Sequence, residues 1–347
     1  MKKGFYFKIA VLAATIAGIA LFIFLFSDSK VSSEEHSLSR GKNEAAISSG
    51  LDNAFAYISS NTKFPTFRCT EDLSDCFRLK NSAFFKASVL QILSEIDEEY
   101  FSSIIKKGVS EILAMQSEYF LWDFSGQTDS SRPHFFPDLD TTSLSAYFLT
   151  LRGVDFHFKE IKETILNKQI EDGVFLTYLR EFQPPLSNSM NKDAIVNANV
   201  LVLLGEEIPS VCEYINDNFD KSLYYKDDAA IFYMLAKAYS RGCNCIKPSV
   251  DKLYDKLKVS DVYSSTMHLS MFITGCFLSD KIEKPIMEKA IGSLLAKEQK
   301  PPFKETFFSY QNPDRHNFFY NFVFSAAVYA EALTKIKAYL TEPDKNR

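Results

Sequence analysis

Two aspartates stand two residues apart where an apolar stretch begins, in the string FPDLDTTS at residues 136–143. A close pair of carboxyl groups can perform acid chemistry, because burial and the charge of one carboxylate raise the pKa of the other and keep it protonated. The same residues suit a helix start, since Asp and Thr are favoured N-cap residues and acidic groups in the first turn interact favourably with the helix dipole. The string therefore leaves two interpretations open for Asp138 and Asp140, an acid with its partner or a helix cap.

A second polar cluster lies in DAIVNANV at residues 193–200. Asp193 can cap this segment, and Asn197 lies four residues on, on the same face of a helix. Amide side chains inside an apolar helix are costly unless they are hydrogen-bonded. We therefore expect Asn197 and Asn199 either to line an inner cavity or to bond a neighbouring loop.

Other candidate motifs lead to simpler interpretations. Asp227 and Asp228 are expected to be helix-start acids, because a metal–diphosphate DDxxD motif would need a carboxylate where Ile231 stands. His268 lies in an apolar segment and is expected to be a core residue.

The sequence contains no zinc-type cysteine spacing and no phosphate-binding loop, so we expect no metal and no cofactor. The net charge of −5 gives no support for nucleic-acid binding.

The elements that must position these residues are helices. Apolar residues recur three or four positions apart, which places them on one face of an α-helix. This spacing occurs in residues 84–96, 143–151, 194–204, 229–239, 266–278 and 322–340. Alternation typical of strands is scarce, so the body is expected to be all-α.

A repeat becomes visible when the loops between these segments are aligned. A helix ending in Gln is followed by one or more aromatic residues, at Gln116 with Trp122, at Gln169 with Phe175, and at Gln299 with several Phe residues. Residues 211–225 keep the helix and the aromatics without the Gln. We expect each Gln to bond loop backbone groups and the aromatic residue to fill the gap between stacked helix pairs.

The string QIEDGVF at residues 169–175 resembles the loop signature of the α/α-toroid superfamily, which includes prenyltransferase β-subunits and squalene and terpene cyclases. The resemblance implies a single α/α toroid, a barrel of repeated helical hairpins. Within it, PDLDTT resembles the DxDD-T motif of class II terpene cyclases, with Thr141 where the family has a third Asp. This resemblance implies that Asp140 is the proton donor and Asp138 its partner.

Four further residues are the candidate substrate-binding side chains, because they lie in or near these strings. They are Trp122, Thr141, Asn197 and Asn199.

The N-terminus predicts a membrane anchor. Residues 9–26 form an uncharged apolar run of 18 residues, close to the ~20 residues that a helix needs to cross a bilayer. The run ends without the small residues of a signal cleavage site, and lysines precede it, so we expect an uncleaved anchor with a cytoplasmic N-terminus. We expect a cytoplasmic segment at 1–8, the anchor at 9–26, a linker at 27–46, an extracytoplasmic toroid at 47–340 and a tail at 341–347.

A body outside the cytoplasm would permit disulfides among the six cysteines. Cys69 and Cys76 could close a small ring, and Cys243 or Cys245 could form a second bridge or bind a metal. Free, partly buried thiols are the alternative.

Three functions remain open. The first is acid-initiated cyclisation of an isoprenoid by a membrane-bound toroid. The second is a non-enzymatic toroid that binds a partner or serves as a scaffold. The third is a carbohydrate-active α/α barrel, which the single Trp disfavours because sugar sites usually expose several.

Overall fold

The computed structural model describes ten stretches of the chain. They are residues 41–70, 76–79, 82–117, 119–124, 137–178, 191–225, 227–260, 265–297, 308–312 and 315–341. The chain forms two compact units, Met1–Ser49 and Gly50–Arg347. Of the first unit only residues 41–49 are described, and they are helical.

The predicted anchor at 9–26 and residues 27–40 of the linker lie outside the described residues. Within the described stretches, no helix has both the length and the apolarity needed to cross a bilayer.

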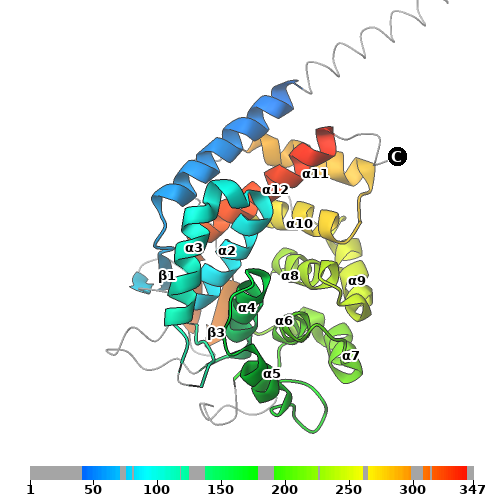
Figure 1. Ribbon diagram of the computed structural model, residues 1–347. Coiled ribbons are helices and arrows are strands. Elements are labelled where there is room, and N and C mark those ends of the chain that lie inside the picture. Colours follow the sequence, from blue (N-terminus) through cyan, green and yellow to red (C-terminus); the bar gives the residue numbers. More distant parts are fainter. Residues whose placement is uncertain are drawn as a thin grey trace, which may run out of the picture. The chain divides into compact units, whose positions relative to one another are not determined.

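Six helices form a closed inner ring (Figure 1). They are α2 (Ala83–Ile96), α4 (Leu139–Leu151), α6 (Ala194–Leu204), α8 (Asp228–Ser240), α10 (Thr266–Leu278) and α12 (Phe322–Thr341). Each packs against the next, and α12 packs against α2 to close the ring.

Outer helices alternate with the inner ones along the chain and pack on their outside. They are α3 (Glu98–Ala114), α5 (Phe158–Leu166), α7 (Pro209–Asn218), α9 (Lys247–Leu257) and α11 (Lys284–Ala296), with the short 3-10 helices η3 (Phe219–Lys221) and η4 (Asn244–Ile246) between them. Residues 50–60 are also helical.

The two classes of helix differ in how they bury their side chains. Every residue of α6 is buried, as expected for a helix that is apolar on all sides. Helix α9 instead buries one stripe that includes Val250, Leu253 and Leu257. The six apolar segments predicted from the sequence coincide with the six inner helices, because the ring buries those helices most completely.

The inner helices α2, α4 and α8 run in the same direction. Arg152, at the end of α4, forms an ion pair with Glu98 just after α2, and Arg241, at the end of α8, forms one with Glu95 near the end of α2. The starts of α4 and α8 meet at the other end, where Tyr225 bonds Asp140. The ring therefore has an N-terminal end and a C-terminal end, named after these helices.

The predicted function of the loop glutamines is confirmed at both described copies. Gln116 donates to the carbonyl of Phe120, and Gln169 donates to the carbonyl of Gly173. The aromatic side chains that follow, Trp122 and Phe175, are fully buried. Each loop thus ends in an aromatic residue that packs into the core.

A four-stranded antiparallel sheet was not predicted. Strands β1 (Thr66–Thr70), β2 (Cys76–Leu79), β3 (Phe308–Asn312) and β4 (Arg315–Asn321) pair in the order β2-β1-β4-β3. The strands are short, and β1 finds its partner β4 only at the far end of the chain. Periodicity within one segment therefore could not indicate the sheet, and the all-α expectation holds for the ring alone.

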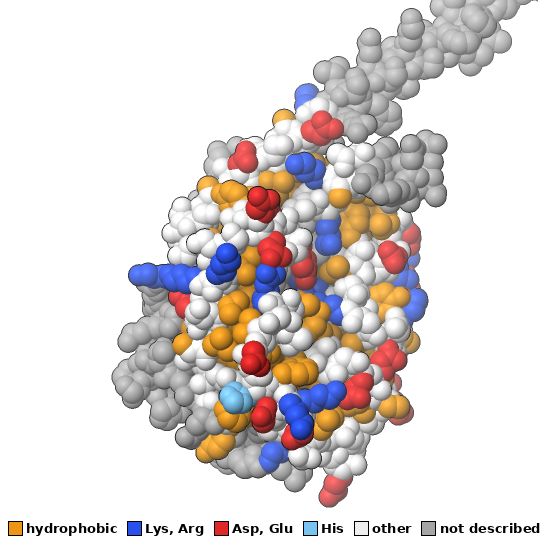
Figure 2. Space-filling model, in the orientation of Figure 1, with side chains coloured by type: hydrophobic (Ala, Val, Ile, Leu, Met, Phe, Trp, Pro, Cys, Tyr) orange, Lys and Arg blue, Asp and Glu red, His pale blue; other side chains and the backbone are white. Residues whose placement is uncertain are grey.

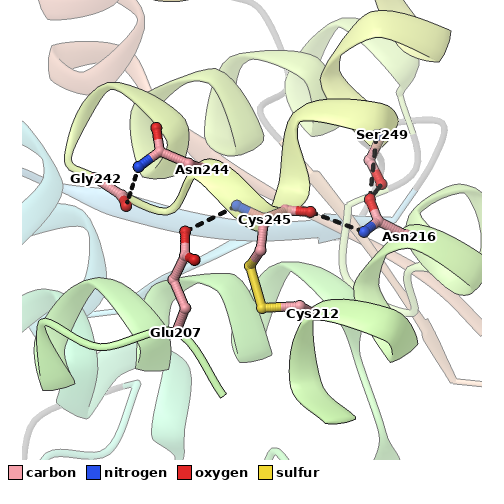
Figure 3. Close-up of a disulfide and its surroundings, with 7 residues drawn as sticks. All are labelled: Glu207, Cys212, Asn216, Gly242, Asn244, Cys245 and Ser249. Carbon is pink, nitrogen blue, oxygen red and sulfur yellow. Dashed lines mark hydrogen bonds between the residues drawn. A yellow bond between two sulfur atoms is a disulfide. The ribbon is translucent and has the colours of Figure 1, made fainter. Parts of the chain in front are cut away.

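The structure contains a disulfide between Cys212 of α7 and Cys245 of η4 (Figure 3). This confirms a bridge at Cys245, while Cys243 is a free buried thiol. Cys69 and Cys76 are register partners of β1 and β2, but their side chains lie outside the described part of the structure.

Candidate active site

The string PDLDTT folds as a helix start. Asp138 is the N-cap of α4, and its Oδ1 accepts a 2.7 Å hydrogen bond from the backbone N–H of Thr141. The cap fixes the first turn of α4, so Asp140, two residues on, occupies a defined position in that turn. The cap interpretation therefore accounts for Asp138, and Asp140 needs a separate explanation.

Asp140 points into the protein, with 8% of its surface exposed. Its Oδ1 accepts a 2.7 Å hydrogen bond from the side-chain amide of Asn199, on α6. Its Oδ2 accepts a 2.8 Å hydrogen bond from the hydroxyl of Tyr225, just before α8. Three neighbouring segments of the ring thus converge on one carboxyl group.

Burial raises the pKa of Asp140 to about 7. The donors on Asn199 and Tyr225 act in the opposite direction, because they stabilise the carboxylate, while the negative charge of Asp193 adds to the increase. The group is therefore protonated in a substantial fraction of molecules near neutral pH, and its conjugate base has two donors in place.

Asp193 fixes the two segments that carry the donors to Asp140. It is the N-cap of α6, where its Oδ1 accepts from the backbone of Ile195 and Val196. Its Oδ2 accepts from the Ser222 hydroxyl at 2.7 Å, and Ser222 in turn accepts from the backbone N–H of Tyr225. Asp193 thus positions Tyr225 as well as the helix that carries Asn199.

The pKa of Asp138 is also raised well above its ordinary value. Burial is the main cause, and the charges of Asp140 and Asp123 contribute, against the hydrogen bond from Thr141. The charge that raises the pKa of Asp140 comes from Asp193. The proposed partnership of Asp138 with Asp140 in catalysis remains a prediction.

A small cavity lies inside the ring. Its lining comes from five inner helices and consists of Ser88, Gln91, Ile92, Leu144, Asn199, Tyr233, Met234, Lys237, Arg241 and Phe324. Asn199 contacts both the cavity and Asp140, so it connects the carboxyl group to the enclosed space. The wall near Phe324 is aromatic, with Phe85 and Phe124 behind it.

The structure places the other predicted substrate-binding residues differently. Asn197 bonds the backbone N–H and C=O of Phe175, so it fixes a loop. Trp122 is fully buried, and its indole N–H donates to the carbonyl of Ile112 at the end of α3. The hydroxyl of Thr141 is buried without a hydrogen-bond partner among the described residues. Only Asn199 lies at both the cavity and the acid.

The role of Tyr225 was not predicted from the sequence. Tyr225 occupies the aromatic position of the degenerate repeat at 211–225, where the better copies have Trp122 and Phe175. A tyrosine at a position that is otherwise apolar was the available signal, because a buried hydroxyl needs a partner. Asp227 and Asp228 are helix-start residues of α8, as predicted, and Asp228 pairs with Lys256.

The geometry bears on the three functions that the sequence left open. Asp138 bonds a backbone amide, as a scaffold requires, whereas Asp140 bonds two side chains, of which Asn199 lines the cavity. The single Trp is buried and cannot stack on a sugar, which disfavours a carbohydrate site. The visible surface mixes charges of both signs with apolar side chains (Figure 2).

No protein-family model matches this chain, and a search of characterised proteins finds no match. Solved structures of the type II terpene cyclase MstE from Scytonema are similar in fold. The free enzyme is 12% identical with a TM-score of 0.62, covering 85% of this chain and 99% of that one. A variant bound to its substrate, geranylgeranyl dihydroxybenzoate, is 13% identical with a TM-score of 0.62, covering 85% and 98%. A variant bound to the product merosterolic acid A is 12% identical with a TM-score of 0.63, covering 86% and 99%.

These similarities confirm the fold that the resemblance implied. The chain has an α/α-toroid, terpene cyclase-like fold over most of its length.

Proposed function

We propose that this protein is a class II terpene cyclase-like enzyme in which Asp140 protonates an isoprenoid. The observation that carries the proposal is a buried carboxyl group with a pKa of about 7 that is held by two donors, one of which, Asn199, lines a small cavity in the ring. The type II terpene cyclase with the similar fold binds a geranylgeranyl substrate, which supports an isoprenoid ligand here.

The chemistry follows from the proton balance at Asp140. The π electrons of an alkene take the Asp140 proton, so a C–H bond forms and a tertiary carbocation remains on the neighbouring carbon. The carboxylate left behind accepts the hydrogen bonds of Asn199 and Tyr225 that are already in place. A second alkene of the same chain then attacks the cation and closes a ring, and loss of a C–H proton to a base ends the sequence.

The apolar part of the cavity wall, formed by Ile92, Leu144, Met234 and Phe324, suits such intermediates. Aromatic faces attract cations, and a dry cavity keeps water from capturing them. Phe324 lines the cavity, and its ring lies 5.7 Å from the ring of Phe85. The substrate class is therefore a linear polyene with alkenes spaced for ring closure.

The test compares the wild type with Asp140→Asn, using linear isoprenoids of increasing length with and without diphosphate. Asn can keep contacts to Asn199 and Tyr225 but carries no acidic proton. We expect cyclic products from the wild type and none from Asp140→Asn when products are separated by gas chromatography and identified by mass.

Asp228→Asn is the matched control, because it makes the same change in the first turn of another inner helix, at an ion pair with Lys256. It should retain turnover. If folded Asp140→Asn still forms cyclic product, Asp140 is not the donor. If the folded wild type forms none, the non-enzymatic toroid becomes the better account.

We also propose that residues 9–26 anchor the protein and that the body lies outside the cytoplasm. The uncharged run of 18 residues supports the anchor, and the Cys212–Cys245 bridge supports an oxidising compartment. The full chain should stay with membranes after alkaline carbonate washing, whereas a chain without residues 1–30 should be released. Release of the full chain would contradict the anchor.

A further inference from the structure

The small cavity in the ring has the size of one water molecule. It offers the centre of a water about 10 Å³, which is close to the space that a single buried water needs. Four of its lining side chains are apolar and six are polar. Cavities that stay dry are lined by apolar groups, whereas a polar cavity holds a water when two to four polar groups can bond it. The question is therefore which lining groups have bonds to offer.

Three of the polar lining side chains are committed to partners in the protein. The hydroxyl of Ser88 donates to the carbonyl of Phe84, one turn earlier in α2. The hydroxyl of Tyr233 donates to Glu331 on α12, and Arg241 pairs with a glutamate of α2. The other three polar lining side chains come from α2, α6 and α8, and they are Gln91, Asn199 and Lys237.

Two of these side chains are amides that use their N–H groups elsewhere. Gln91 donates to the carbonyl of Leu144 at 2.9 Å, and Asn199 donates to Asp140 at 2.7 Å. An amide side chain also carries an acceptor oxygen. Neither acceptor oxygen receives a hydrogen bond from the part of the chain that the structure describes. Both amides can therefore accept a bond from inside the cavity that they line.

Lys237 is the donor that faces these acceptors. Its ammonium lies 3.4 Å from Oε1 of Glu331, but that oxygen is buried without a hydrogen-bond partner among the described residues. The ion pair thus leaves the three N–H donors of Lys237 to be used. Only 7% of the residue is exposed, so bulk water does not serve them. Side chains of a helix lean towards its N-terminus, which carries the ammonium towards the end of the ring where Asp140 lies.

We propose that this cavity binds one water molecule, which accepts a hydrogen bond from Lys237 and donates to the carbonyl oxygens of Gln91 and Asn199. The donors then point one way, from Lys237 through the water and Asn199 to the carboxyl group of Asp140. A charged first donor strengthens the bonds that follow it in such a chain. Lys237 is thereby a positioning residue for Asp140, and the inference rests on the proposed function only in calling Asp140 the acid.

Such a water is not free to capture a carbocation. Its oxygen faces an ammonium, which withdraws electron density from it, and both of its hydrogens are bonded to amide oxygens. It is therefore a weak nucleophile, and its presence agrees with a cyclisation that excludes free water.

The water itself is tested by a high-resolution crystal structure of the full-length protein. We expect one water within about 3.2 Å of the ammonium of Lys237 and of the carbonyl oxygens of Gln91 and Asn199. A cavity filled by a side chain, or a water that does not contact Lys237, would overturn the proposal. The experiment needs no substitution, so it decides the matter even where a variant does not fold.

The chain to the acid is tested by titrating Asp140 directly, without substrate. Infrared difference spectra across pH follow its carboxyl C=O band, which Asp140→Asn identifies by losing it. We expect Lys237→Met to raise the pKa of Asp140 by about 0.5 or more, because the carboxylate loses support. In an Asn199→Ala background the chain is already cut, so the same substitution should have less than about half that effect.

The charges around both ends of the chain are the same in the two backgrounds. The groups that act on Asp140 are Asp138, Asp193 and Tyr225, and those that act on Lys237 are Glu95, Glu331 and Tyr233. Lys256→Met is the matched control, because it removes the same charge from α9, and it should leave the pKa of Asp140 unchanged.

The proposal is overturned if Lys237→Met leaves the pKa of Asp140 unchanged, or raises it equally in both backgrounds. An equal rise would mean that the charge acts through space and not along the chain. These results are separate from the cyclase test. Cyclic product without the water or the coupling would overturn only the water chain, and both of them without cyclic product would overturn only the cyclase.

Discussion

Asp140 lies where burial makes its ionisation costly, but two hydrogen-bond donors already contact its carboxyl group. Burial favours the neutral acid, while Asn199 and Tyr225 offer donors to the charge that forms when the proton leaves. A general acid is most useful when its pKa lies near the working pH. A pKa of about 7 meets that condition.

The pH dependence of turnover tests this balance. Only protonated Asp140 donates, so kcat should be level below pH 7 and fall as pH rises above the pKa of about 7. Tyr225→Phe removes a donor that lowers this pKa, so the fall should move to higher pH, and the level rate should drop because the acid is weaker. Steady-state rates across pH would measure both changes.

Tyr214→Phe, on the outer helix α7, serves as the control and should keep the wild-type profile. An unchanged midpoint in Tyr225→Phe would mean that the titrating group is not the carboxyl that Tyr225 contacts.

At this scale the sequence predicted some of the site. Asp138, Asp140 and Asn199 were found because motif and position indicated them. Tyr225 and the role of Asp193 in positioning it were not predicted. Both depend on contacts between residues that are 29 and 85 positions apart in the sequence. Trp122 and Asn197 were predicted to bind substrate; the structure shows them bonded to the backbone of Ile112 and of Phe175, and their part in substrate binding stays a prediction.

At the scale of elements, the inner helices depend on polar side chains that fix the loops between them. Asn197 is fully buried, makes three hydrogen bonds and satisfies both backbone groups of Phe175. Thr142 occupies the corresponding place on α4, where it bonds the backbone N–H and C=O of Trp122. These side chains set the distance between an outer helix and the inner helix that follows it.

Asn197→Ala should therefore destabilise the fold. It leaves the N–H and C=O of Phe175 without partners in a dry interior, at a cost of about 2–4 kcal/mol. Asn218→Ala, which removes a part-buried bond to Tyr214 within one helix, should cost less than about 1 kcal/mol. Chemical denaturation would measure both free energies of unfolding, and equal losses would contradict the loop-fixing role.

The inner helices were predicted well because each is apolar along its whole length. The sheet was missed because its strands are short and its central pairing joins β1 to β4 across 255 residues of chain, from Thr66 to Asn321. Register between such distant strands depends on ring closure by α12 against α2, which no local pattern encodes.

At the scale of the whole molecule, the ring is closed by packing and its outside is reinforced by the Cys212–Cys245 bridge. The bridge spans 33 residues and joins α7 to η4, next to the contacts of Asn216 with Cys245 and Ser249 (Figure 3). Cross-linking two outer elements restricts the unfolded chain.

Replacing both cysteines by serine should lower the free energy of unfolding by about 3–4 kcal/mol, as expected for a loop of this length. Denaturation with and without reductant would measure this, and the reduced wild type should match the double variant. Equal stability of the oxidised and reduced wild type would show that the bridge does not stabilise the native body.

The toroid followed from the resemblance that the loop repeats suggested, and the similarity to solved terpene cyclases confirms it. The ion pairs of Lys237 with Glu331 and of Arg241 with Glu95 could not be predicted, because these residues come from three helices far apart in sequence. Their meeting depends on the parallel arrangement of the inner helices.

The most direct test of the central claim is to run the reaction in deuterium oxide and weigh the product. The Asp140 proton exchanges with solvent, so acid-initiated cyclisation should place one solvent deuterium in the carbon skeleton, and Asp140→Asn should yield no labelled product. Cyclic product from the wild type without deuterium, or labelled product from Asp140→Asn, would contradict Asp140 as the proton donor.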